Sequence, residues 1–331
     1  MASNYRGSLR YSSYQGSVDS LTDSLNAMTL TRKPQSGASH LSRGQPTGSS
    51  RGLQCVVCKI RPKFGEYQTC STHCIKKVLK NGGDPDMCDY CHEKPRTPGK
   101  RQCGMDCIRK ATVACLVCKC RPKNRRYQFC GRTCKRIAME YTPFILSIPK
   151  QHVTYQMVAK KFIDSWKSTT LQIPAIREIY KINHDDASLQ RYNEYKETVG
   201  NEQFLYHGTA RLCQLGVATT ELCASLTCVC NIVRTSFQMA KAKPTGLAFG
   251  KGIYTSSASN KAYRQYSGVH GAVVVSKVVL GKIKHVSRFN EVLSCPVGFN
   301  SVVYDRMDGK LNESVVYRDD AIRPVFLILF Q

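Results

Sequence analysis

Residues 141–331 alternate hydrophobic and polar positions, first with a helical period and then with a strand period. The spacing of Val158, Phe162 and Trp166 predicts an amphipathic helix in PKQHVTYQMVAKKFIDSW. The segment SLQRYNEYKETVG predicts a second helix, with Ser188 as a candidate N-cap. Runs rich in β-branched and aromatic residues then predict strands at 204–206, 246–254, 271–281, 314–317 and 324–330. Many strands after two helices favour an α+β domain over 141–331, rather than a doubly wound parallel sheet.

The N-terminal segment, residues 1–54, carries no sustained apolar period. It contains 12 serines together with several Gly, Arg and Pro residues. Such a composition cannot bury enough apolar surface to offset the entropy of ordering the chain. We therefore expect a disordered, Ser-rich basic tail.

Residues 55–140 form a cysteine-rich array with an internal repeat. Each of three units has a Cys-x2-Cys pair, eleven residues and a Cys-x3-Cys pair, and each carries a basic-Pro-basic triplet at the same offset. The triplets are Arg61-Pro62-Lys63, Lys94-Pro95-Arg96 and Arg121-Pro122-Lys123. The cysteines are Cys55, Cys58, Cys70 and Cys74, then Cys88, Cys91, Cys103 and Cys107, then Cys115, Cys118, Cys130 and Cys134.

This spacing predicts three structural zinc sites. A Cys-x2-Cys knuckle directs two sulfurs to one point, and a Cys-x3-Cys pair places two sulfurs on one face of the first turn of a helix. Four thiolates then complete a tetrahedral Zn²⁺ site. The helices are expected through 75–79, 108–112 and 137–139, which gives three small treble-clef-like zinc modules.

A further group of cysteines lies between residues 213 and 230, with irregular spacing. Its members are Cys213, Cys223, Cys228 and Cys230. The segment ELCASLTCVCN is short of large core residues, so a metal ion would help to order it. The alternative is four buried free cysteines that act as small hydrophobic residues. The sequence leaves both interpretations open, so a fourth zinc ion is an expectation.

Composition limits the class of protein. The chain has 331 residues, which suggests about two domains. A hydrophobic content of 42% with 22% charged residues excludes a wholly disordered chain or a collagen-like rod. The sequence has neither the ~18 consecutive apolar residues of a membrane span nor a signal-peptide run. We expect an intracellular protein, in the nucleus or cytoplasm, with no membrane partner.

The net charge of +26 indicates a polyanionic partner, most often nucleic acid. Zinc-bound thiolates lower this value, but the chain stays strongly basic. Residues 55–140 contain 20 basic and 7 acidic residues, a surplus of 13 before any metal binds. The basic-Pro-basic turns could contact phosphates, or the array could dock on a protein. Charge alone does not separate nucleic-acid binding from protein docking.

Three short segments of the C-terminal domain carry candidate chemistry. A histidine stands near the end of a predicted strand in FLYHGT, at His207, followed by Gly208 and Thr209. A tyrosine ends a predicted glycine-flanked strand in GKGIYTS, at Tyr254. A glutamate precedes a late strand in NESVVY, at Glu313. Each segment alone is weak evidence, and their order in the chain is what carries the argument.

Residues 143–331 resemble the catalytic domain of the poly(ADP-ribose) polymerases, which has a His-Tyr-Glu triad in this order. With its zinc array, the chain is similar to small fungal members of the family. The resemblance implies an antiparallel sheet core with flanking helices, and NAD as substrate. It implies His207, Tyr254 and Glu313 as the catalytic residues. His207 would orient the NAD ribose, the backbone of Gly208 would bind the nicotinamide amide, and Tyr254 would stack on the nicotinamide ring. Glu313 would bond the ribose 2′-hydroxyl and polarise the acceptor, and Thr209 is a further candidate NAD-binding residue.

Two positions depart from the pattern of that family. The family has a serine eight residues after the first tyrosine, where this chain has Ala262, with Ser259 nearby. The second stacking tyrosine follows the first by eleven residues, where this chain has Gln265. We interpret a one-residue insertion and expect Tyr266 to stack, with Tyr263 as the alternative. Ser259, Tyr263 and Tyr266 complete the candidate NAD site.

The leading hypothesis is an NAD-dependent ADP-ribosyltransferase, a pentosyltransferase that acts on protein or nucleic-acid acceptors. Nicotinamide leaves NAD as a neutral base from a cationic N-glycoside, so one carboxylate suffices where ordinary glycosidases need two. Glu313 permits both mono- and poly-ADP-ribosylation. A second hypothesis is an enzyme similar to tRNA 2′-phosphotransferases. A third is a zinc-based binding module with a degenerate transferase domain.

Overall fold

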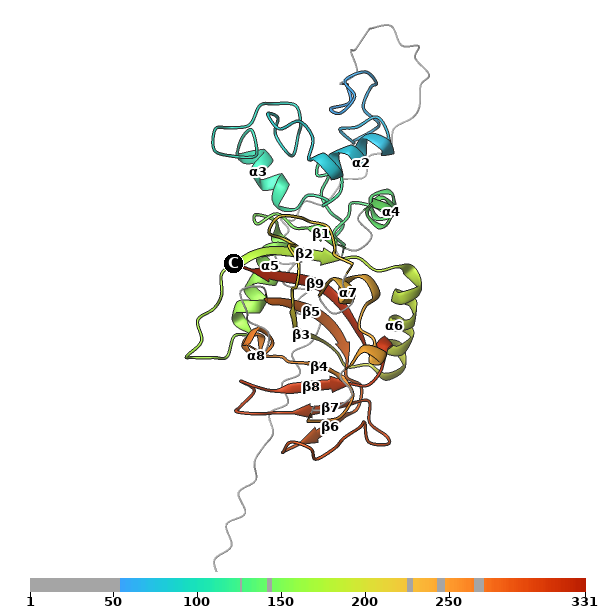
Figure 1. Ribbon diagram of the computed structural model, residues 1–331. Helices are drawn as coiled ribbons and strands as arrows, with labels where there is room; N and C mark the ends of the chain where they lie inside the picture. The colour runs from blue at the N-terminus through green and yellow to red at the C-terminus, as the bar shows by residue number, and fades with distance from the viewer. Residues whose placement is uncertain (1–53, 126, 142–144, 225–228, 243–247, 265–270) are drawn as a thin grey trace, which may run out of the picture. The chain divides into compact units, whose positions relative to one another are not determined.

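The computed structural model describes residues 54–331, apart from residue 126 and segments 142–144, 225–228, 243–247 and 265–270 (Figure 1). The predicted tail therefore lies outside the described residues except for Gln54. The described part is a mixed α+β structure, as the sequence predicts. None of its helices is both long and apolar enough to cross a membrane.

The three cysteine units repeat in structure as they do in sequence. Each contains one helix, which begins between the two cysteines of the Cys-x3-Cys pair. The helices are α2 (Thr72–Asn81), α3 (Met105–Thr112) and α4 (Arg132–Tyr141). In each unit the backbone N–H of the first cysteine donates to the carbonyl of the basic residue that precedes the triplet proline. That proline forms an isolated β-bridge with the residue before the cysteine. The bridges are Gln54 with Pro62, Met87 with Pro95, and Ala114 with Pro122. The predicted helices and the threefold repeat are confirmed.

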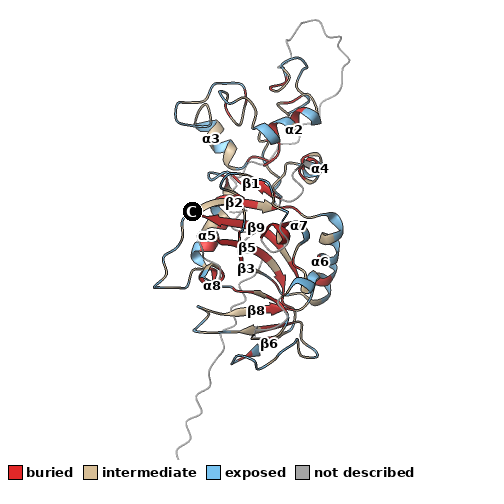
Figure 2. Cartoon of the chain, viewed as in Figure 1, coloured by how far each residue is buried: buried red, intermediate tan, exposed pale blue. Residues whose placement is uncertain are grey.

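The larger sheet has the strand order β1-β2-β9-β5-β3, and every pairing in it is antiparallel. Its central strands, β5 and β9, are almost wholly buried because helices cover both faces (Figure 2). The strands are β1 (Ile145–Ser147), β2 (Ile176–Ile182), β3 (Glu202–Ala210), β5 (Gly271–Val279) and β9 (Ile322–Phe330).

Two sets of helices supply the two halves of the core. Tyr155, Val158 and Phe162 of α5 pack with Ala262 of α8 on one face of the sheet. Helices α6 and α7 pack on the other face, with Tyr192 among the buried residues. The bounds are α5 (Val153–Asp164), α6 (Asp186–Val199), α7 (Val229–Thr235) and α8 (Ser259–Arg264), with short 3-10 helices η1 (Met239–Lys241) and η2 (Asp319–Ala321).

The smaller sheet has the order β4-β8-β7-β6 and contains one parallel pair, β6 with β7. Within the part of the chain that the structure describes, one isolated β-bridge connects it to the larger sheet: Tyr206 of β3 exchanges two backbone hydrogen bonds, 2.8 and 2.9 Å long, with Ser256. The strands are β4 (Ile253–Thr255), β6 (Ile283–Val286), β7 (Ser301–Tyr304) and β8 (Glu313–Val316). This junction is where the candidate catalytic residues meet.

Two local predictions need correction. Of the strand predicted at 246–254, residues 246 and 247 lie outside the described residues, and of the rest only Ile253 and Tyr254 belong to β4. Gly250 forms a turn with φ +72°, and a Cβ there would lie 1.7 Å from the carbonyl oxygen of Leu293, so only glycine fits. Helix α6 is capped by Asp185, whose carboxylate accepts from the backbone of Ser188 at 2.7 Å, because the helix begins two residues before Ser188.

The third zinc unit shares a core with the C-terminal domain. Leu116, Val117 and Ile137 are buried together with Leu146 and Ile148. His152, 2% exposed, joins the two parts with both ring nitrogens: Nε2 donates to the Ala114 carbonyl at 2.9 Å, and Nδ1 accepts from the N-terminus of α5. The proposed domains 55–140 and 141–331 are therefore in close contact through this unit.

Candidate functional site

A cavity of about 390 Å³ lies where β3, β4 and the start of β8 meet. Its volume is within the range of small-molecule sites, and its walls combine apolar and aromatic side chains with a few polar groups. Three predicted site residues from distant parts of the chain face it: His207, Tyr254 and Glu313. Gly208, Phe237, Lys261 and Ala262 also line it.

The imidazole of His207 is held in one orientation. Its Nδ1 lies 2.8 Å from the carbonyl oxygen of Tyr254, and because a carbonyl only accepts, Nδ1 is the protonated nitrogen. Phe237 packs edge-on against the ring at 5.0 Å between centroids. Burial lowers the pKa of His207 below its ordinary value, and the hydrogen bond to Tyr254 opposes this only in part. His207 is therefore a neutral imidazole whose Nε2 is an acceptor.

Gly208 offers its backbone to the cavity. The backbone groups of Tyr206 point to Ser256, away from β5. Hydrogen-bonding direction alternates along an antiparallel strand, so the N–H and C=O of Gly208 point the same way as those of Tyr206. At Gly208 the cavity replaces Ser256 on that side. One donor and one acceptor are thus arranged to meet a planar amide.

Tyr254 contributes its ring rather than its hydroxyl. The hydroxyl accepts from the backbone N–H of Phe249 at 2.8 Å and donates to the carbonyl of Gly250 at 2.9 Å. Burial raises the pKa of Tyr254 to about 12, so the hydroxyl keeps its proton. Both bonds fix the ring against the cavity, where it can stack on a flat ligand.

Glu313 forms an ion pair inside the cavity. Its Oε1 lies 2.8 Å from Nζ of Lys261, and the two side chains are 15% and 20% exposed. Lys261 lies on α8, whose first two residues are anchored by hydrogen bonds. Ser259 Oγ donates to the Phe162 carbonyl at 2.6 Å, and Asn260 Oδ1 accepts from the backbone N–H of Lys167. The sequence analysis did not identify Lys261.

Strand pairing brings Tyr254 and Glu313 together. Strand β4 pairs with β8, and Thr255 Oγ1 donates to the Ser314 carbonyl at 2.9 Å. Asn312, just before Glu313, accepts from the Ser256 hydroxyl at 2.6 Å. The segments that follow β4 and precede β8 are therefore hydrogen-bonded to each other, next to the bridge between Tyr206 and Ser256.

Three residues predicted for the NAD site lie outside the lining of the cavity. Ser259 is fully buried and its hydroxyl is engaged by Phe162. The Tyr263 ring packs into the core against Trp166 and Phe330, at 5.6 and 4.9 Å between centroids. Thr209 is buried on β3 and is not part of the lining. Tyr266 lies outside the described residues.

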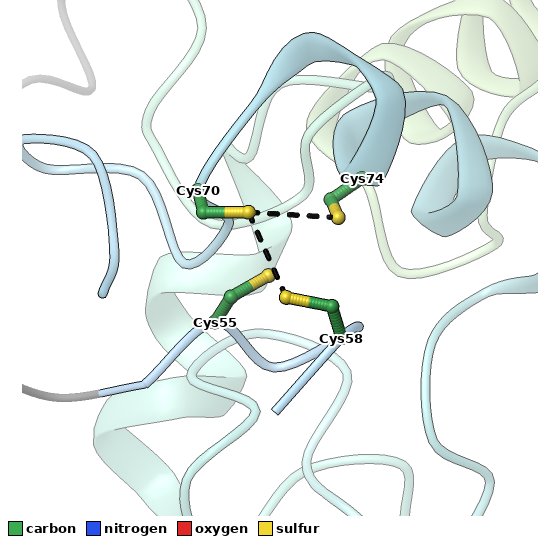
Figure 3. A group of neighbouring side chains, drawn as sticks. All are labelled: Cys55, Cys58, Cys70 and Cys74. Atoms are coloured by element: carbon green, nitrogen blue, oxygen red, sulfur yellow. Dashed lines mark hydrogen bonds between the residues drawn. The ribbon is translucent and has the colours of Figure 1, made fainter. Parts of the chain in front are cut away.

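The array cysteines gather into three groups of four, and none of them is in a disulfide bond. Figure 3 shows the first group, Cys55, Cys58, Cys70 and Cys74. Within each group, the sulfur atoms that contact one another are 3.6 to 3.8 Å apart. A tetrahedral site with Zn–S bonds of about 2.3 Å has S–S edges of about 3.8 Å, whereas a disulfide bond is about 2.05 Å long. The spacing fits Zn²⁺ in all three units.

The group predicted in the C-terminal domain is present in part. Sγ atoms of Cys213, Cys223 and Cys230 lie within 4.8 Å of one another. The contact between Cys213 and Cys230 is 3.6 Å. Cys228 lies outside the described residues.

Several cations of the basic-Pro-basic triplets are occupied within the array. Lys63 pairs with Glu93 at 2.6 Å, and Arg121 pairs with Glu66 at 2.7 Å. Arg96 pairs with Asp89 at 2.5 Å. These ion pairs connect or stiffen the units, so the triplets supply fewer phosphate contacts than their sequence indicates.

Comparison with known proteins identifies the domain that carries this cavity. The family model of the poly(ADP-ribose) polymerase catalytic domain matches residues 152–326, more than half of the chain. A comparison with curated proteins found no match. The matched range contains β2 to β8, most of β9, and all the described residues that line the cavity. The chain therefore belongs to the poly(ADP-ribose) polymerase catalytic-domain family, whose domain supports ADP-ribosyl transfer.

Proposed function

We propose that the protein transfers ADP-ribose from NAD to an acceptor and releases nicotinamide. The observation that carries the proposal is the convergence of His207, Tyr254 and Glu313 on one cavity, with the backbone of Gly208 at its edge. Each of these groups matches one part of the nicotinamide riboside half of NAD.

The nicotinamide binds through its amide and its ring. The N–H of Gly208 donates to the carboxamide oxygen and its C=O accepts from the carboxamide nitrogen, in the way a neighbouring strand would pair. The ring of Tyr254 lies against the cationic pyridinium, which favours an aromatic face. Ala262 stands at the position where the family has serine and provides no hydroxyl. The carboxamide is therefore held by the backbone of Gly208 without a bond from this position.

The ribose is held by the two polar members of the triad. Nε2 of neutral His207 accepts from a ribose hydroxyl, while Nδ1 stays bonded to Tyr254. Glu313 accepts from the ribose 2′-hydroxyl. Lys261 holds the Glu313 carboxylate through the 2.8 Å ion pair, so we propose Lys261 as a positioning residue.

Bond cleavage then needs charge stabilisation more than proton transfer. The N-glycosidic bond breaks as nicotinamide takes the bonding electrons and neutralises its own ring, leaving oxocarbenium character on the ribose. The Glu313 carboxylate stabilises that positive charge, and it polarises the acceptor that attacks the anomeric carbon. The acceptor loses its proton as the new glycosidic bond forms.

Zinc has a structural part in this proposal. The three four-cysteine groups would hold Zn²⁺, which supplies folding free energy to units too small for a core of their own. The array, with 20 basic and 7 acidic residues, is the proposed contact surface for a protein or nucleic-acid acceptor. The acceptor itself is a matter for experiment.

Incubation of the full chain with NAD labelled in its adenylate part tests the proposal. We expect label on the protein itself or on added protein or nucleic acid, one free nicotinamide for each ADP-ribose, and inhibition by added nicotinamide. Transfer of a 2′-phosphate from RNA to NAD would instead support the phosphotransferase hypothesis. Binding of NAD without cleavage by the zinc-loaded chain would contradict enzymatic function.

A further inference from the structure

Three cysteines outside the repeated array meet beside the proposed NAD cavity. Cys213 follows β3, Cys223 lies in the loop beyond it, and Cys230 is on α7. Their sulfur atoms lie within 4.8 Å of one another, and Cys230 has no exposed surface. The three residues come from separate turns of the chain, so local backbone geometry does not force them together.

The distances separate a metal site from the alternatives. The Cys213 and Cys230 sulfurs are 3.6 Å apart, close to the edge of a zinc–thiolate tetrahedron and far longer than a disulfide bond of about 2.05 Å. The same spacing, 3.6 to 3.8 Å, occurs in the three array groups. A hydrophobic contact between thiols would not require a third sulfur at the same point.

Two arginines beside the cluster fit an anionic centre. Arg211, only 2% exposed, donates from Nη1 to the Leu215 carbonyl, and its Nε has no hydrogen-bond partner among the described residues. Arg234 donates to the carbonyls of Leu222 and Cys223, next to the cluster. A Zn²⁺ ion with three thiolates carries one net negative charge, which the buried guanidinium of Arg211 and the half-buried guanidinium of Arg234 would balance.

We propose that Cys213, Cys223 and Cys230 bind a zinc ion in addition to those of the array. Each thiol gives up its proton to solvent on binding, no group is oxidised or reduced, and one coordination position remains for a further ligand.

The site would brace one wall of the cavity. Asn231 and Ile232, which follow Cys230 on α7, line the cavity, and Phe237 packs edge-on against His207. A metal that joins Cys230 to Cys213 and Cys223 fixes the start of α7 against the end of β3. This consequence for NAD rests on the proposed function, whereas the metal site itself does not.

Metal content of the full chain tests the site independently of activity. Elemental analysis of the wild-type chain purified with zinc should give about four zinc ions per chain, three in the array and one here. Cys213→Ser and Cys223→Ser should each give about three. Cys295→Ser, a matched control at a cysteine that contacts Phe299 instead, should keep four. Three ions in the wild-type chain would overturn the proposal.

A second measurement does not depend on the folding of any variant. Alkylation of the wild-type chain, read by peptide mapping, should leave Cys213 and Cys223 unmodified until a chelator removes the metal. Cys295 should react equally with and without chelator. Chelator-independent labelling of Cys213 and Cys223 would contradict the site. If the site is present, Cys213→Ser should also weaken NAD binding severalfold, while an unchanged NAD affinity would overturn the bracing role alone.

Discussion

The ammonium group of Lys261 lies 2.8 Å from the Glu313 carboxylate, and both side chains face the same cavity. The pair joins α8, which is anchored to α5, to the first residue of β8. A carboxylate that must meet a developing positive charge gains from being held in place beforehand. Lys261 supplies that restraint, although the sequence pattern did not identify it as a site residue.

Replacement of Lys261 should therefore reduce catalysis more than NAD binding. In Lys261→Met we expect the transfer rate to fall about tenfold or more, because Glu313 loses the ion pair with Lys261 that holds its orientation. The dissociation constant for NAD should change much less. Lys150→Met, at an exposed lysine outside the cavity, is the control. Equal rates in the two variants would contradict the positioning role.

The two tyrosines near the cavity should behave differently. Tyr254→Ala should weaken competitive binding of nicotinamide by about 1–3 kcal/mol, the range of an aromatic contact with a desolvated cation. Tyr263→Ala should lower the melting temperature instead, because that ring packs on Trp166 and Phe330. Nicotinamide inhibition constants and thermal melts distinguish the two. A loss of nicotinamide affinity in Tyr263→Ala alone would refute this assignment.

NAD affinity should depend on pH through His207. Burial holds the pKa of His207 below its ordinary value of 6.5, so the folded protein keeps the neutral, acceptor form at that pH. Because folding lowers the pKa of His207, its imidazole is neutral at pH 6.5 and above. The neutral form is lost as the pH falls through the pKa of the folded protein, which lies below 6.5. Calorimetric titration with NAD should give constant affinity from about pH 8 to 6.5 and weaker binding below. Affinity that rises on acidification would contradict an acceptor role.

The second and third zinc units offer a matched comparison. Cys91 and Cys118 hold the same place in the repeat. The third unit contributes Leu116 and Ile137 to the core that contains Ile148 and α5, whereas none of the described residues of the second unit belongs to that core. Cys118→Ser should lower the melting temperature of the transferase domain and its activity, since a lost structural zinc ligand costs several kcal/mol. Cys91→Ser should leave both nearly unchanged. Equal effects in differential scanning calorimetry would show that the third unit is not part of the transferase core.

Much of the fold could be predicted because its signals are local. Cysteine spacing identified the three zinc units, and the apolar runs of β5 and β9 identified the two most buried strands. The strands at 283–286 and 301–304 were not predicted, because they are short and partly exposed. The strand at 176–182 was missed because IREIYKI does not alternate strictly. Ile176, Ile179 and Tyr180 have the helical spacing i, i+3 and i+4, next to predicted helices.

Site residues that belong to a short sequence motif could be predicted, whereas residues whose position depends on tertiary packing could not. His207, Tyr254 and Glu313 were recognised from their motifs and do face one cavity. Ser259 was misassigned because only the structure reveals that its hydroxyl bonds to Phe162, 97 residues earlier in the chain. Lys261 went unrecognised for the same reason, since its contact with Glu313 depends on how α8 docks.

The most direct test of the account is nicotinamide release from NAD by the zinc-loaded full chain, compared between wild type, Glu313→Gln and Glu197→Gln. Glu197 is an exposed residue on α6, away from the cavity, and controls for the loss of one negative charge. We expect release in Glu313→Gln to fall by roughly two orders of magnitude or more, the scale of a lost electrostatic contact in the transition state, with NAD binding largely retained. Release in Glu197→Gln should equal that of wild type. Wild-type turnover in Glu313→Gln would contradict the central claim that this carboxylate stabilises the transition state.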